Sequence, residues 1–287
     1  MRFRRGEIVA LCAPLGILLG GWLVLPAIFG LVTTLTTYGP SLRTFRFVGL
    51  ANYSAVLRDP DFGAAVRNIV VFCATAVPVE LVIGFGIAYA VRGTRRGRRW
   101  IRIALLLPWL LSPIGSGVMW HFLLAPATGP LNFILGWLNL PEVSSPSGSP
   151  TLALPTAIAI EVWRLSPLVA FLLVPALEAV PAERWEDARL DGLGVLGRIT
   201  NVVLPAIRPV LASVTMLAIG LALGTFDSLL ILTGGGPGTA TVTPALFSYK
   251  EAYPIANWPI SSAAAWIIAL AVIGTGAAYL KLAGGAE

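Results

Sequence analysis

Six long, mostly apolar segments dominate this sequence, and each can cross a lipid bilayer. A helix needs about 20 such residues to cross roughly 30 Å of hydrocarbon. Only 12% of the 287 residues are charged, against about a quarter in a soluble domain. Helices satisfy the backbone hydrogen bonds that lipid cannot. The sequence therefore predicts an all-α membrane protein, one domain over residues 1–287, with six transmembrane helices at about residues 8–34, 68–91, 103–124, 152–177, 209–232 and 260–280.

The first apolar segment follows three arginines, as the hydrophobic region of a signal peptide does. The uncharged run from Ile8 to Thr34 is too long for such a region and has no small-residue cleavage site followed by polar sequence. We therefore expect it to remain in the protein as the first transmembrane helix.

Basic residues indicate the orientation of the spans. Most of the 20 Lys and Arg residues fall in alternate connecting segments, including the cluster RGTRRGRRW at 92–100. Such an excess is typical of cytoplasmic loops. We expect both termini to be cytoplasmic. The net charge of +6 then reflects membrane topology, and we expect no nucleic-acid partner.

Motifs of catalytic chemistry do not stand out. The GGGPG run at 234–238 lacks the lysine and hydroxyl that follow the glycines of a phosphate-binding loop. The chain has one histidine and two cysteines, with no metal-ligand spacing. The sequence predicts neither an enzyme nor a metal site.

A polar, charged stretch at 178–208 separates the fourth and fifth apolar segments. Residues Glu178 to Gly192 can form a short amphipathic helix, with Pro181 near its start. Glu186 and Asp187 lie toward its N-terminal part, where negative charge suits the helix dipole. Gly192 is predicted to end this helix in a left-handed conformation.

Such a helix at a membrane face can fit a groove on a soluble partner. Trp185, Ala188 and Leu193 would supply apolar contacts to the partner, and Glu186 an ion pair. The alternative is that the segment is only a connector on the membrane surface.

The sequence EDARLDGLGVLGRITNVVLP at 186–205 resembles the EAA loop of permease subunits from binding-protein-dependent ABC importers. Six residues occupy the family positions, namely Glu186, Ala188, Asp191, Gly192, Leu204 and Pro205. Asp187 stands where that pattern has alanine. Leu193, Ile199 and Val202 also depart from the pattern but remain apolar.

Further stretches resemble the carbohydrate-uptake type of these permeases, the maltose and glycerol-phosphate type. They are VGLANY at 48–53, RNIVVF at 67–72, LLLPWLLSP at 105–113, GVMWHFLLAPATGPLN at 117–132 and FDSLLILTGGGPGTAT at 226–241. The resemblance therefore covers nearly the whole chain.

This resemblance implies the type I ABC importer transmembrane fold, with a cytoplasmic coupling helix, in a bacterial-type cytoplasmic membrane. The implied partners are membrane lipid, a second permease subunit (often a different chain), an extracytoplasmic solute-binding protein and two copies of a cytoplasmic ATPase. ATP and Mg would bind to that ATPase, and this non-catalytic chain would carry no cofactor. The implied coupling residues are Trp185, Glu186, Asp187, Ala188, Asp191, Gly192 and Leu193. The solute would be a sugar, or a related polyol or glycerophosphate, imported by alternating access.

Charged residues inside predicted spans are functional candidates, because charge is costly in lipid. Glu161 and Arg164 are three residues apart and can pair with each other or contact solute. Trp163 can stack on a sugar ring or serve packing. Asp227 can bind solute hydroxyls or cap a helix break, and Glu80, near Pro78, is predicted to satisfy a kinked backbone.

Three other functions remain open. A permease for peptides or amino acids would have a similar coupling loop. An ion-coupled secondary transporter would show inverted repeats, which are not evident, and a membrane-embedded enzyme would need a nucleophile or a metal set.

Overall fold

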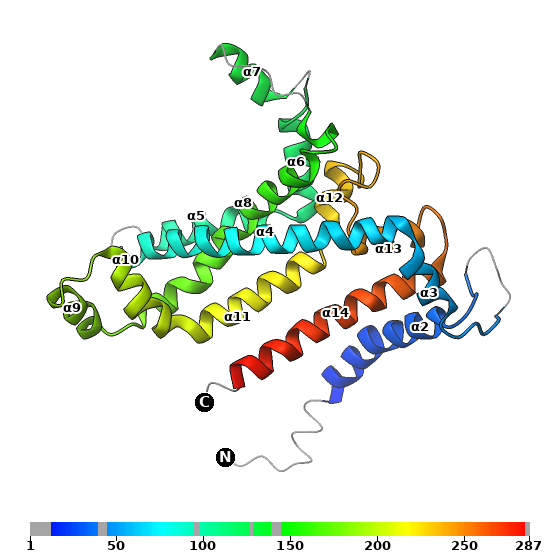
Figure 1. The fold of residues 1–287 in the computed structure, drawn as a ribbon, viewed down its shortest axis with the longest axis horizontal. Coiled ribbons are helices and arrows are strands. Elements are labelled where there is room, and N and C mark those ends of the chain that lie inside the picture. The colour runs from blue at the N-terminus through cyan, green and yellow to red at the C-terminus, as the bar shows by residue number, and fades with distance from the viewer. Residues whose placement is uncertain (1–12, 40–44, 95–97, 127–128, 139–144, 285–287) are drawn as a thin grey trace.

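The computed structural model describes residues 13–39, 45–94, 98–126, 129–138 and 145–284 (Figure 1). Within these ranges the regular secondary structure is helical, apart from an isolated antiparallel bridge between Thr36 and Phe47. The helices are α2 (Leu25–Thr34), α3 (Ala51–Arg58), α4 (Pro60–Val91), α5 (Arg98–Leu110), α6 (Pro113–Leu123), α7 (Pro130–Trp137), α8 (Ala153–Glu178), α9 (Ala182–Leu190), α10 (Val195–Arg198), α11 (Leu204–Leu223), α12 (Asp227–Leu232), α13 (Pro244–Ala252) and α14 (Trp258–Gly284). Short π-helical turns, η1 (Gly20–Val24) and η3 (Ile199–Val203), precede α2 and α11, and a 3-10 turn, η2 (Pro146–Gly148), precedes α8.

Five helical stretches are long and apolar enough to cross a membrane, namely Ala13–Thr34, Pro60–Val91, Ala153–Glu178, Val195–Leu223 and Trp258–Ala277. A sixth crossing is possible if the bent pair of Ile103–Leu110 and Pro113–Leu123 counts as one span. The predicted all-α membrane class is confirmed. The start of the first predicted span, residues 8–12, and the arginines at 2, 4, 5, 95 and 96 lie outside the described residues.

Helix α4 begins earlier than the predicted span at 68–91, because Asp59 caps it. The Asp59 carboxylate accepts hydrogen bonds from the backbone N–H groups of Asp61 (2.8 Å) and Phe62 (3.3 Å). Pro60 follows at the first helical position, where a missing N–H costs little. The helix therefore extends past the apolar run into polar sequence.

The predicted span at 103–124 is broken by an 85° bend between α5 and α6. Ser112 is extended (ψ 148°), as a residue before proline prefers, and Pro113 starts the next helix. The Ser112 hydroxyl accepts from Gly115 N at 3.0 Å. Because apolar residues run straight through this break, hydropathy alone does not reveal it.

The predicted span at 209–232 also differs from the structure. The helical stretch begins at Val195 and ends at Leu223, and α12 forms separately after a break at 224–226. Phe226, with φ −150°, departs from regular helix geometry there, while the surrounding sequence remains largely apolar. The predicted loop at 178–208 is thus largely helical, formed by α9, α10, η3 and the start of α11.

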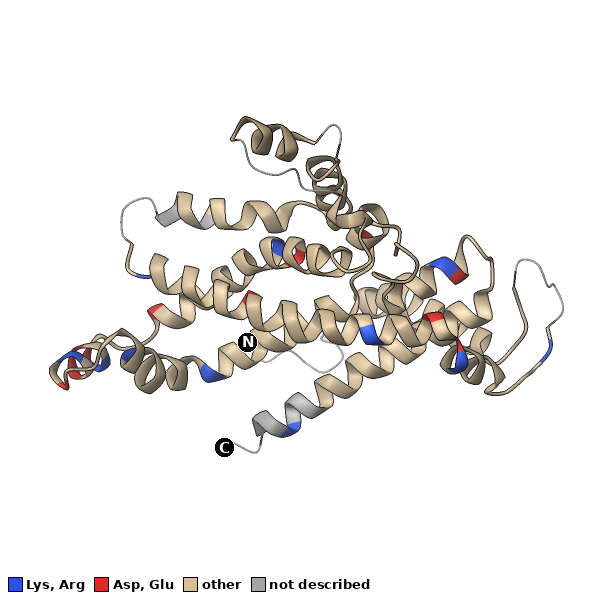
Figure 2. Cartoon of the chain, turned by 45° about the horizontal axis from the view of Figure 1, so that its top comes forward, with Lys and Arg blue, Asp and Glu red and all other residues tan. Residues whose placement is uncertain are grey.

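Helices α4, α8 and α11 form the centre of the molecule (Figure 1). Helix α4 packs along α8, and their backbones approach closely at Gly84, where an added Cβ would lie 2.8 Å from the Ser166 carbonyl oxygen. Helix α14 lies beside α2 and α13. Charged residues gather toward the two ends of the helices, one end carrying α9 and the other α3 and α13 (Figure 2). The long helical stretches between these ends, tan in Figure 2, carry few charged residues and so suit the hydrocarbon core of a bilayer.

Candidate functional site

Helix α9 carries most of the residues predicted to couple to an ATPase, and we call it the coupling helix after that prediction. It ends in two backbone hydrogen bonds around Gly192. Gly192 N donates to Arg189 O at 3.1 Å, and Leu193 N donates to Ala188 O at 3.0 Å. Gly192 has φ +72°, a left-handed conformation that glycine adopts without the steric penalty of a Cβ. The left-handed end at Gly192 is as the sequence predicts. The helix starts at Ala182 and not at Glu178 as predicted, because Glu178 is the last residue of α8 and a short turn separates the two helices.

The coupling helix turns a small part of its surface toward its own chain. Ala188 is 3% exposed and Trp185 is half-buried, whereas Glu186 and Asp187 are exposed. Leu193 is half-buried beside Gly197. Ala188 is therefore mostly covered by its own chain, and the contact with a partner that the sequence predicts for it stays a prediction.

Trp185 meets the end of α4 through the side chain of Arg92. The Arg92 guanidinium carbon lies 3.7 Å from the centroid of the Trp185 ring and 3.7 Å from that of the Tyr89 ring. The two ring centroids are 6.3 Å apart. A cation over an aromatic face contributes about 0.5–2 kcal/mol, depending on desolvation. We call Trp185, Arg92 and Tyr89 the aromatic clamp.

The surroundings of Arg92 destabilise its positive charge, so its contact with the two aromatic rings matters more. Burial lowers the pKa of Arg92 from its usual value, an interaction with Tyr89 opposes this shift, and the positive charges of Arg198 and Arg189 reinforce it. Arg92 Nη1 is buried and has no hydrogen-bond partner among the described residues. The Trp185 and Tyr89 rings are therefore the favourable surroundings that the structure shows for this cation.

A groove of about 350 Å³ runs between the coupling helix and the segment leading into α11. Its lining mixes charged and apolar side chains, namely Arg184, Asp187, Ala188, Asp191, Leu193, Asn201, Val202 and Pro205. Four of the predicted coupling residues, Asp187, Ala188, Asp191 and Leu193, therefore share one surface.

Three apolar side chains near this groove are strongly exposed, and the sequence reasoning missed them. Leu190 is 86% exposed, Leu196 74% and Val195 55%. Contiguous exposed apolar residues on a charged surface mark interaction sites. Their signal in the sequence was apolar residues flanking Asp191 and Gly192 within a polar stretch.

Inside the membrane region, Glu161 and Arg164 pair with each other. Arg164 Nη2 donates to Glu161 Oε1 at 2.7 Å, and Arg164 Nε donates to Glu161 Oε2 at 3.2 Å. Glu161 is 2% exposed and Arg164 8%. The charges of both residues act on Glu80, which is fully buried and whose carboxylate oxygens have no hydrogen-bond partner among the described residues. The predicted bond from Glu80 to a kinked backbone is therefore absent.

The other two intramembrane candidates take no part in the hydrogen bonds of that pair. Trp163 meets Trp120 edge-to-face, with centroids 5.5 Å apart, so it contributes to packing between α8 and α6. Asp227 is the first residue of α12, where a negative charge suits the dipole, but no side-chain hydrogen bond caps that helix.

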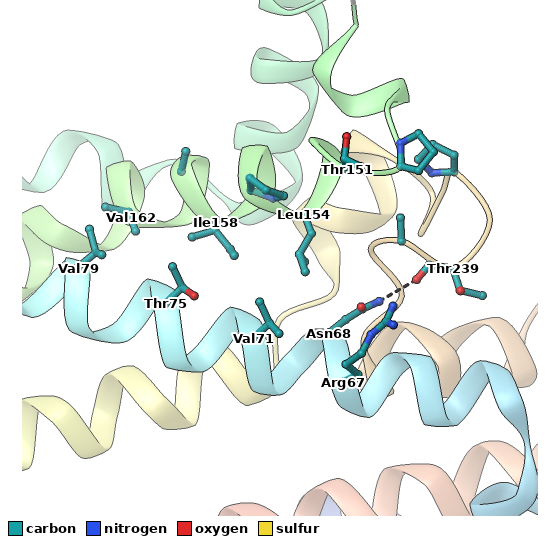
Figure 3. A pocket seen from close by; sticks show the side chains of 15 residues that line it. Arg67, Asn68, Val71, Thr75, Val79, Thr151, Leu154, Ile158, Val162 and Thr239 are labelled. Atoms are coloured by element: carbon teal, nitrogen blue, oxygen red, sulfur yellow. Dashed lines mark hydrogen bonds between the residues drawn. The ribbon is translucent and has the colours of Figure 1, made fainter.

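A cleft of about 870 Å³ opens between α4 and α8 near the end opposite the coupling helix (Figure 3). Val71, Thr75 and Val79 line it from α4, at helical spacing of four. The α8 wall has the same spacing and is formed by Leu154, Ile158 and Val162. Polar groups of Arg67, Asn68, Thr75, Thr151 and Thr239 give this apolar cleft hydrogen-bonding capacity. The four predicted solute-path residues, Glu161, Trp163, Arg164 and Asp227, are not among the residues that line it.

The glycine-rich run at 233–241 closes one side of the cleft as an ordered turn. Thr233 and Thr241 hydroxyls are 2.6 Å apart, and the Thr241 hydroxyl also donates to Gly236 O at 3.2 Å. Gly234, Gly235 and Gly238 have positive φ. We call residues 233–241 the outer loop. Asn68 fixes it to α4, because its side-chain amide donates to Thr239 O at 2.7 Å (Figure 3).

The structure combines a polar-edged cleft near one end of a helical membrane protein with an exposed, capped helix at the other end. This arrangement suits a membrane-embedded transport subunit. Residues 80–280 match the family described as binding-protein-dependent transport system inner membrane component. The chain belongs to this family, as its coupling segment indicated.

Curated relatives extend the similarity beyond that region. The trehalose/maltose transport system permease protein MalF of Thermococcus litoralis is 31% identical over 236 residues, which cover 82% of this chain and 79% of the relative. The trehalose transport system permease protein SugA of Mycobacterium tuberculosis is 28% identical, covering 84% and 76%. The sn-glycerol-3-phosphate transport system permease protein UgpA of Yersinia pestis is 29% identical, covering 88% and 84%.

Solved structures share the fold. A chain of a bacterial ABC transporter that imports the acidic polysaccharide alginate superposes with a TM-score of 0.80 at 20% identity, covering 96% of this chain and 94% of the other. A chain from the alginate transporter in complex with its pentasaccharide-bound periplasmic protein gives 0.77 at 19% identity, covering 93% and 90%. The predicted type I importer fold is confirmed.

Proposed function

We propose that this chain is the transmembrane subunit of an ATP-driven importer that carries a sugar, or a related polyol or glycerophosphate, into the cytoplasm. Membership of the family supports binding-protein-dependent transport. The names of the relatives, which refer to trehalose, maltose and sn-glycerol-3-phosphate, support the solute class.

The observation that carries the coupling half of this proposal is the surface formed by α9 and the neighbouring α10. Glu186 is exposed, and Leu190 and Leu196 present apolar surface that the chain itself does not cover. We assign this surface to a cytoplasmic ATPase, which would bind ATP and Mg and perform the hydrolysis. This subunit would then do no bond chemistry and would supply coupling free energy between an ATP site and a solute site.

If the α9 surface binds a cytoplasmic ATPase, the expected orientation of the chain and the places of the other partners follow. The α9 end would face the cytoplasm, together with both termini, in a bacterial-type cytoplasmic membrane. The outer loop and the cleft would face a solute-binding protein. Two such chains, identical or different, would pair, with one ATPase on each coupling helix. Alternating access would then be a rocking of packed helices between two states.

The cleft between α4 and α8 is our candidate for solute passage. Its polar atoms suit hydroxyl groups, and its apolar walls suit the faces of a sugar ring. Glu161 and Arg164, which bond to each other and do not line this cleft, would contact solute at another point of its path.

The test is gentle detergent extraction of the tagged chain from its own membranes, with co-purifying polypeptides identified by mass. Recovery of an ATPase and a second membrane subunit is expected. The Glu186→Arg variant should insert into the membrane normally, but it should no longer bind the ATPase, and solute uptake should stop. A wild-type chain that purifies alone, under conditions that preserve other complexes, would refute the proposal. Uptake of a panel of sugars, amino acids and peptides then separates the solute classes.

A further inference from the structure

Helix α4 is attached at each end to a segment with a different role. Its 32 residues run without interruption from Pro60 to Val91, despite Pro78 in its interior. Arg92, directly after its last residue, holds the coupling helix, and Asn68, in its outer part, holds the outer loop. At 1.5 Å per residue, these two attachment points are about 36 Å apart along the helix axis.

The inner attachment fits closely. The guanidinium carbon of Arg92 lies 3.7 Å from the centroid of the Trp185 ring and 3.7 Å from that of the Tyr89 ring, so one cation contacts both rings. Tyr89 also lies 5.9 Å, centroid to centroid, from Phe85 one turn back on α4. Displacement of Trp185 therefore presses on aromatic side chains that belong to α4 itself.

The outer attachment is a pair of hydrogen bonds to backbone. Asn68, 2% exposed, donates to Thr239 O at 2.7 Å and to Val242 O at 3.0 Å. Movement of this part of α4 must carry the outer loop with it or break both bonds. Between the two attachments, α4 forms one wall of the cleft through Val71, Thr75 and Val79.

From this geometry we propose that Arg92 and Trp185 are positioning residues that transmit displacement of the coupling helix to α4, and through α4 to the cleft and the outer loop. The proposal rests on the proposed function, since it requires an ATPase to move α9. It adds the contact by which that movement enters the membrane region.

Trp185 differs in this role from the docking residues. Glu186 and Leu190 point to solvent, whereas Trp185 is half-buried and packs with the core cluster that includes Val180 and Val203. A docking residue and a transmitting residue therefore occupy the same helix on different faces, and substitutions can separate their effects.

The experiment uses the assembled complex in proteoliposomes, with the binding protein present. Trp185→Leu keeps apolar bulk but removes the ring face, Trp185→Tyr restores a ring, and Arg92→Lys keeps the charge but loses the planar stack. Leu190→Ser is the matched docking variant on the same helix. Three quantities are measured for each: ATPase retained per permease, ATP hydrolysed, and solute imported per ATP.

We expect Trp185→Leu and Arg92→Lys to keep the ATPase and hydrolyse ATP, while solute imported per ATP falls about tenfold, within the usual range of coupling between sites. Trp185→Tyr should recover most of that ratio. Normal import per ATP in both Trp185→Leu and Arg92→Lys would overturn the proposal. Loss of the ATPase from Trp185→Leu would also overturn it and make Trp185 a docking residue, leaving the proposed function intact. A wild-type complex without any ATPase would refute the proposed function itself.

Discussion

The side-chain amide of Asn68 donates to the backbone carbonyl of Thr239 at 2.7 Å, across 171 positions of sequence. A second bond from the same amide reaches Val242 O at 3.0 Å. One buried side chain of α4 thus satisfies two carbonyl groups of a segment that has little regular secondary structure. This contact therefore holds the outer loop against α4.

Asn68→Asp should release the outer loop while keeping the shape of the side chain. The carboxylate cannot donate, so two carbonyls lose their partner, and each unsatisfied buried group costs about 1–3 kcal/mol. We expect a lower thermal midpoint in detergent and faster proteolysis within 233–243. Asn68→Ala should behave similarly, because both variants lack the donor. Equal stability of Asn68→Asp and wild type would contradict this role.

Gly84→Ala should weaken the contact between α4 and α8. The new methyl group would lie 2.5 Å from Val169 Cγ1 and 2.8 Å from Ser166 O, and overpacking of this kind costs about 1–3 kcal/mol. Gly86→Ala, on the same helix with nothing within 4 Å, is the control and should be tolerated. Thermal unfolding of the two purified variants checks the difference.

Gly192→Ala should destabilise the end of the coupling helix. A non-glycine residue at φ +72° carries a steric cost of about 1–2 kcal/mol. Gly194, two residues on, has φ −63° and open space around it, so Gly194→Ala should have a much smaller effect. Solute uptake and ATPase retention of both variants distinguish a demand for left-handed backbone from a general intolerance of side chains in this segment.

Arg164→Met should be more damaging than the double variant Glu161→Leu/Arg164→Met. Removal of one partner leaves Glu161 as an uncompensated charge in the interior, at a cost of about 3–5 kcal/mol, whereas apolar replacement of both is often nearly neutral. The yield of folded protein and its thermal midpoint report stability. If the double variant folds but does not import solute, the pair has a role in transport beyond structure.

Leu190→Ser should weaken ATPase binding without lowering the stability of the isolated chain. The side chain is 86% exposed, so its replacement removes few internal contacts. Leu196→Ser, at 74% exposure, should act in the same way. The amount of ATPase recovered with each purified variant measures the effect. If both variants lost thermal stability but still bound the ATPase, the two leucines would stabilise the fold of the chain and would not bind the partner.

Composition and hydropathy were sufficient to predict the helical membrane class, and the resemblance of residues 186–205 to a known motif predicted the family. Apolar length determines whether a segment can span, and the order of Glu186, Asp191, Gly192 and Pro205 is visible without any tertiary contact. The left-handed turn at Gly192 was also predictable, because few residues other than glycine adopt it freely.

Breaks and long-range partners were not predictable in the same way. Hydropathy averages over a window, so the bend at Ser112 and the interruption at 224–226 lie unseen within apolar sequence. The pairing of Asn68 with Thr239, and of Arg92 with Trp185, depends on how α4 packs. The polar or aromatic character of these four residues does not identify their partners, because such residues are also common where a helix leaves the membrane.

The 85° bend at Ser112 limits where lipid can lie against this protein. Helix ends leave backbone carbonyl and N–H groups without intrahelical partners, and hydrocarbon offers them none. The Ser112 hydroxyl satisfies only one such group, Gly115 N. The corner between α5 and α6 must therefore face protein or water. We therefore expect annular lipid to be interrupted at this corner and to cover the straight helices on either side.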